Sequence, residues 1–128
     1  MKRRLGVLFL VLLLATLPGA ATAQVVSGCP GTTRLVAYAH EAITVSSTAL
    51  TFTTATMLPT GVNPVAIKIT VETDAIRYLD TGTAPTDSTG HQSDPGEVLW
   101  VCGSSIGRFQ MIRKTNNATA RVTFYRGS

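Results

Sequence analysis

Apolar and polar residues alternate with a period of two along much of the chain, which is the pattern of half-buried β-strands. In residues 65–73 every second position from Val65 to Val71 is aliphatic, and the positions between them are small or polar. Residues 118–126 alternate in the same way. No window beyond the N-terminal leader repeats apolar residues at helical spacing. The pattern predicts a chain built of strands.

Further strands are predicted at 76–79, 97–102 and 106–113, with weaker signals at 33–39, 43–46 and 49–54. A turn at Asp74 and Ala75 would join 65–73 to 76–79 as a hairpin. Residues 97–102 are apolar on both faces, which predicts a central strand. About seven or eight short strands indicate an all-β fold, either a jelly-roll-like antiparallel β-sandwich or a small barrel.

The N-terminus has the organisation of a secretory leader. Residues 2–4 are basic, residues 5–17 are apolar, and a small-residue cleavage pattern ends at Ala23. The apolar run is shorter than the roughly 20 residues that span a bilayer. We therefore predict a cleaved signal peptide at 1–23 and a single exported domain at 24–128, periplasmic or extracellular and without a membrane span.

Removal of the leader changes the charge balance. Three of the eleven Lys and Arg lie in the leader, which leaves eight against seven Asp and Glu. The basic residues that remain are spread along the chain and form no basic run. Because nucleic-acid binding requires a concentrated basic surface, we expect no nucleic-acid partner.

The sequence holds two cysteines, Cys29 and Cys102. In an oxidising compartment an even number of cysteines favours a disulfide, here between Cys29 and Cys102. An alternative comes from residues 26–29, which read Val-Ser-Gly-Cys like a bacterial lipobox. In that case Cys29 would carry a lipid anchor.

Residues 80–82 read Asp-Thr-Gly after two apolar residues, as the catalytic segment of aspartic proteases does. Such an enzyme needs two carboxylates that share a proton, so one copy could act only in a symmetric, retropepsin-like dimer. The distance from Asp80 to Gly107, 27 residues, leaves less chain than a flap and its strands require. We therefore interpret residues 80–82 as a turn, with Gly82 at positive φ, and keep the protease through Asp80 as a remote alternative.

The remaining polar residues suggest no catalytic or metal site. The acidic side chains between Asp80 and Glu97 do not have the spacing of an EF-hand loop, and His40 and His91 have no neighbouring ligand pattern. We expect no enzymatic activity, no cofactor and no metal. A ligand-binding surface could use Tyr78, His91 and Tyr125, whereas Trp100 is expected to pack across strands.

The segment 69–125 carries a spaced series of motifs: VET at 71–73, IRY at 76–78, GTAPT at 82–86, GH at 90–91, IxxFxxIR at 106–113 and VTFY at 122–125. In this series the chain resembles a small β-rich module of phage and prophage proteins, and residues 42–53 fit the opening strands of that module. The resemblance implies a virion-associated structural or accessory role without an active site. Thr81 is an insertion relative to the turn of that module.

These observations predict a non-enzymatic, exported structural or accessory domain, related to phage or prophage proteins. It would act through protein partners or self-association in an assembly. The alternative is a carbohydrate-binding, adhesive module that uses the surface of Tyr78, His91 or Tyr125.

Overall fold

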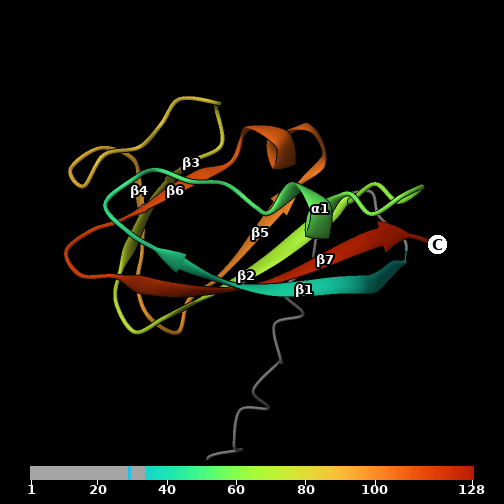
Figure 1. Ribbon diagram of the computed structural model, residues 1–128, viewed down its shortest axis with the longest axis horizontal. Coiled ribbons are helices and arrows are strands. Elements are labelled where there is room, and N and C mark those ends of the chain that lie inside the picture. The colour runs from blue at the N-terminus through green and yellow to red at the C-terminus, as the bar shows by residue number, and fades with distance from the viewer. Residues whose placement is uncertain (1–28, 30–33) are drawn as a thin grey trace, which may run out of the picture.

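The computed structural model describes Cys29 and residues 34–128, which form two antiparallel β-sheets packed against each other (Figure 1). Sheet A has the strand order β1-β7-β2-β5 and sheet B the order β4-β3-β6. The strands are β1 Leu35–Val45, β2 Ala66–Glu72, β3 Ile76–Leu79, β4 His91–Ser93, β5 Val98–Cys102, β6 Gln110–Arg113 and β7 Ala118–Gly127, with two short helices, α1 Thr54–Met57 and η1 Gly103–Arg108. The predicted β-sandwich is confirmed, and the small-barrel alternative is wrong because the sheets do not close on each other.

The strand order is that of a jelly roll. Leu50, which lies between β1 and β2, forms an isolated bridge with Met111 of β6 at the edge of sheet B. If this bridge is counted as a short second strand, β2 to β7 become the third to eighth strands. Sheet A then has the order 1-8-3-6 and sheet B the order 2-7-4-5. That order is produced by two interlocked Greek keys, as in eight-stranded jelly rolls.

The core lies between the sheets and follows the predicted alternation. In β7, Ala120, Val122 and Phe124 are buried while Arg121 is exposed. In β2, the aliphatic positions face the same core. Phe52 joins the layers, since its ring stacks on Phe109 at 5.3 Å and meets Phe124 edge-on at 5.7 Å between centroids.

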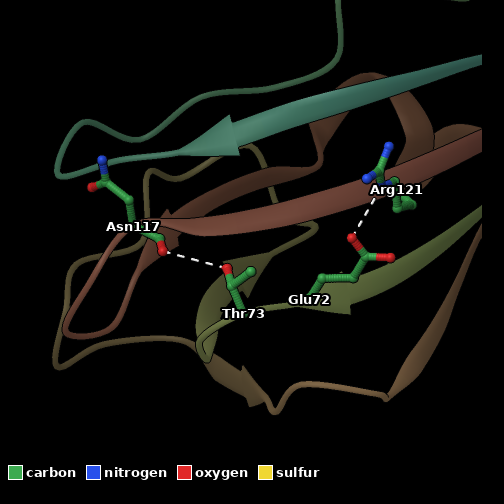
Figure 2. Close-up of polar contacts among 4 residues, drawn as sticks. All are labelled: Glu72, Thr73, Asn117 and Arg121. Carbon is green, nitrogen blue, oxygen red and sulfur yellow. Dashed lines mark hydrogen bonds and ion pairs between the residues drawn. The ribbon is translucent and has the colours of Figure 1, made fainter.

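The predicted hairpin between β2 and β3 is wrong, because these strands belong to different sheets. Thr73 has φ 71°, and the Asp74 N–H donates to the Glu72 carbonyl, which closes a γ-turn that redirects the chain. The Thr73 hydroxyl also donates to the Asn117 carbonyl at 3.5 Å (Figure 2). This tight turn sends the chain across the sandwich rather than back along the same sheet.

Polar contacts at the surface lie on both sides of this crossing. Arg121 Nε donates to Glu72 Oε2 at 3.0 Å across the exposed face of sheet A (Figure 2). The carboxylate of Asp74 accepts bonds from the backbone N–H groups of Ala75 and Asn116, at 2.7 and 3.1 Å. Chiefly through the bond from Ala75, and then through Asn116, these contacts lower the pKa of the Asp74 carboxyl.

Other strand predictions need smaller corrections. The weak signals at 33–39 and 43–46 belong to one strand, β1, and 49–54 contributes only the Leu50 bridge. The predicted strand at 106–113 divides into the end of η1 and strand β6. Residues 97–102 do form a strand, but β5 is at the edge of sheet A and not at its centre.

The predicted disulfide is present between Cys29 and Cys102, with 5.4 Å between their Cα atoms. A sulfur in a disulfide cannot also carry the thioether of a lipid anchor, so the lipobox interpretation of Cys29 is incompatible with this bond. The predicted signal peptide, residues 1–23, lies outside the described residues. Within the part of the chain that is described, no helix is long and apolar enough to cross a bilayer.

Loss of the disulfide should destabilise the fold strongly. The bond closes a loop with a sequence separation of 73, for which the loss of chain entropy in the unfolded state amounts to about 4 kcal/mol. Urea unfolding of the oxidised protein should therefore show a free energy larger by about this amount than unfolding in reductant. The Cys29→Ser, Cys102→Ser double variant is the control, since reductant should not change its unfolding. Equal stability with and without reductant in the unmodified protein would contradict the structural role of the bond.

Candidate functional site

Strand β5 pairs with β2 along one side, and along its other side no described strand is present. The ladder with β2 fixes which groups are used: Val71 N–H donates to the Glu97 carbonyl, and Gly103 N–H donates to the Val65 carbonyl, both at 3.1 Å. Because the pattern alternates along an antiparallel strand, Leu99 and Val101 also face β2. The backbone N–H and C=O groups of the intervening residues, Val98, Trp100 and Cys102, point away from the sheet.

The other three edges are covered or short. Along β1, a bulge interrupts the register, α1 packs alongside, and the Tyr38 hydroxyl donates to the Met57 carbonyl at 2.6 Å. Along β6, Leu50 and Met111 exchange backbone bonds at 2.8 and 2.9 Å. Strand β4 has only three residues. Bulges, covering segments and short edges are the usual devices that prevent strand pairing between molecules.

Within residues 34–128, none of these devices is found on strand β5. All five of its residues are apolar, with no proline, glycine or charge. Val98, whose side chain lies on the outer face of sheet A, is 44% exposed. An exposed, regular and apolar edge of this kind is a template for pairing with another chain. It is the strongest sign of function in the described residues.

A cleft of about 350 Å³ runs beside this edge, where β5 of sheet A faces β3 and β4 of sheet B. We call it the β5 cleft. Its lining consists of Tyr78, Asp80, His91, Ser105, Phe109 and the consecutive residues 99–102. Since neighbouring residues of a strand point to opposite faces, a lining of four consecutive residues means that the backbone edge of β5 itself forms one wall.

Tyr78 lines the β5 cleft and contacts two other rings of its lining. Its ring stacks on Phe109 at 5.4 Å and lies 5.5 Å from the imidazole of His91. Burial raises the pKa of the Tyr78 phenol, and the carboxylates of Asp80 and Glu97 raise it further. The phenol therefore stays protonated at neutral pH and keeps its O–H as a hydrogen-bond donor.

Two glycines let the loop between β3 and β4 approach this site. Gly82 has φ +89°, as the sequence predicts, and its N–H donates to the Arg108 carbonyl at 3.1 Å. Gly90 has φ +117°, and a Cβ there would lie 2.8 Å from the Tyr78 carbonyl oxygen. A side chain at position 90 would push the backbone away from Tyr78.

The structure brings two of the three predicted surface residues together. Tyr78 and His91 share the β5 cleft, because β3 and β4 are paired and place these residues opposite each other. Tyr125 lies on the outer face of sheet A, where its ring is 5.4 Å from that of Trp100. The predicted cross-strand packing of Trp100 is therefore confirmed. Sequence reasoning missed Leu99, Ser105 and Phe109, since only the fold reveals that η1 and β5 approach Tyr78.

Asp80, the residue of the protease alternative, lies exposed at the rim of the cleft. The fold does place residues 80–82 beside β6, since Gln110 Nε2 donates to the Gly82 carbonyl at 3.0 Å. As for metal binding, among the residues described no three His, Cys, Asp or Glu side chains gather where they could bind a metal ion. The loop is held by backbone contacts of Gly82, and the Asp80 carboxylate makes no hydrogen bond with a described residue.

Comparison with known proteins identified no family model, no curated protein and no solved structure that matches this chain.

The turn at residues 80–82 should depend on Gly82 more than on Asp80. Gly82→Ala should lower the free energy of unfolding by about 1–2 kcal/mol, because φ +89° is unfavourable for a residue with a Cβ. Asp80→Asn should change it by less than about 0.5 kcal/mol, since the side chain is exposed. Gly107→Ala is the matched control, as that glycine lacks positive φ and has open space around it. Urea unfolding measures all three, and a larger loss for Asp80→Asn than for Gly82→Ala would refute this account.

Proposed function

We propose that this chain is an exported, non-enzymatic domain that serves as a structural or accessory component of a larger assembly, related to phage or prophage proteins. The observation that carries the proposal is the apolar outer edge of β5, which pairs with no other strand in the described part of the chain. The other sheet edges are bulged, covered or short, so the open edge of β5 is the place where another protein would add. Association through this edge is the function that the arrangement supports best.

Two further features support this role. Jelly rolls recur in viral capsid proteins, which agrees with the phage resemblance of residues 69–125, although a shared fold is an analogy and does not determine function. The disulfide between Cys29 and Cys102 suits an oxidising compartment such as the periplasm or the extracellular space. The disulfide is consistent with export of the chain before it assembles.

Carbohydrate binding is the second candidate, supported by the paired rings of Trp100 and Tyr125 on the outer face of sheet A. Sugars stack on such aromatic surfaces, and jelly rolls also occur in lectins. The residues expected from the sequence are less suited, since the Tyr78 ring already packs against Phe109 and His91. We favour a protein partner because unpaired backbone groups of a strand are matched by another strand, not by a sugar.

A photocrosslinking experiment tests the proposed function. Val98 is replaced by p-benzoylphenylalanine, and the protein is made in the cells that normally produce it. Leu58 on the α1 side is the control position, because it is 43% exposed against 44% for Val98. Illumination should give a discrete crosslinked product from position 98, identified by mass spectrometry as another protein of the same particle or envelope fraction. No product from position 98, or the same products from both positions, would contradict the proposal.

A further inference from the structure

The edge of β5 that no described strand covers lies beside the β5 cleft. The N–H and C=O groups of Val98, Trp100 and Cys102 point outward along one straight edge, as derived from the ladder with β2. On the inner side of this edge, the β5 cleft opens between the sheets. A strand that pairs with β5 would thus place every second side chain in the cleft.

The lining of the cleft selects the side chains that would enter it. Its lining includes the apolar side chains of Leu99, Val101 and Phe109, of which Leu99 is only partly buried. The polar side chains of Tyr78, His91 and Ser105 form other parts of the lining. A volume of about 350 Å³ is at the small end of ligand pockets and accommodates a few aliphatic side chains. Asp80 at the rim supplies negative charge, which favours a basic residue next to the aliphatic ones.

A second copy of this chain fits the site less well than a separate peptide. If two β5 strands paired with each other, the inward side chains brought by the second copy would be its own Leu99 and Val101. These pack in the core of their own sandwich, where Val101 is 6% exposed and Leu99 contacts the buried cluster. They could not also fill the cleft of the first copy. A segment without its own sandwich has no such restriction.

We propose that the β5 cleft binds an extended segment of a partner protein, which adds to the free edge of β5 as a new strand. The segment alternates aliphatic residues, which enter the cleft, with polar residues, and it carries a Lys or Arg near Asp80. Its backbone exchanges hydrogen bonds with Val98, Trp100 and Cys102. This mode is β-strand addition, in which the backbone supplies affinity and the alternate pockets supply specificity. The inference rests on the proposed function and names the chemistry of its partner.

Selection from a display library of random linear peptides of about ten residues tests this proposal on the purified protein. Enriched sequences should show aliphatic residues at every second position and a basic residue. One enriched peptide is then synthesised in two forms, with N-methyl groups on alternate amides of one strand edge or of the other. One form should bind about tenfold or more weakly and the other nearly as well as the unmodified peptide, because only one edge faces β5.

Variants of the protein test the same contact from the other side. Val98→Pro removes an outward N–H without removing a bond to β2, since proline is tolerated at sheet edges, and should weaken peptide binding at least about tenfold. Val98→Ala keeps the N–H and should bind within about threefold of the unmodified protein. Val98→Lys adds a charge on the outer face of sheet A and retains the N–H, so this variant should also bind the peptide. Thermal unfolding confirms that each variant is folded before binding is compared.

Several outcomes would overturn the proposal. These are the absence of any enriched peptide, equal effects of the two N-methylated forms, or binding by Val98→Pro equal to that by Val98→Ala. Dimerisation of the protein that is lost in Val98→Pro, without peptide binding, would assign the edge to a second copy and also refute it. If position 98 crosslinks to a protein of the particle while peptides fail, strand addition is wrong and the proposed function stands. If peptides bind as expected but no crosslink forms, the proposed function fails and strand addition stands.

Discussion

The ladder between β2 and β5 is the interaction on which the account of this molecule depends. β2 lies inside sheet A and pairs with β7 on one side and β5 on the other. Its register with β5, from Ala66 opposite Cys102 to Thr70 opposite Val98, decides which residues of β5 face the core. The same register decides which backbone groups of β5 bond to β2 and which point away from it. A shift by one residue would exchange the two sets, bury Trp100 and turn the bonded groups of Leu99 outward.

The disulfide fixes one end of this strand. Cys102 is the last residue of β5, and its partner Cys29 is buried. On the outer face of sheet A, Ala66 lies between Cys102 and Tyr125 in register and has no exposed surface, although it points away from the core. The covalent bond ties Cys29 to the last residue of β5.

The local alternation of residues predicted the strands of sheet A. It did not predict where each strand lies within the two sheets. β2 and β7 alternate cleanly because one face of each meets the core and the other meets solvent. β5 is apolar on both faces, which predicted a central strand, yet its outer residues lie at the edge and Trp100 packs on Tyr125. The turn at Thr73 resembles a hairpin turn in sequence, but its backbone leads to the other sheet. β4 was missed because His91, Gln92 and Ser93 show no apolar alternation.

The candidate site was predictable only in part for the same reason. Tyr78 and His91 could be selected by residue type, and the fold places them together. Their meeting with β5 depends on contacts between the two sheets, which the sequence does not encode in any local pattern. The open edge itself is a property of strand order, so an apolar run such as residues 98–102 predicts either a buried centre or an exposed edge.

Hydrogen exchange of individual amides measures the central claim, the free edge of β5, most directly. The account predicts alternation along the strand: the amides of Leu99 and Val101 exchange slowly because they bond to β2, and those of Val98, Trp100 and Cys102 exchange rapidly. Slow exchange at all five residues would contradict the account, because it would mean that the outer edge is already paired. Rapid exchange at all five would contradict it as well, because the ladder with β2 would then be absent.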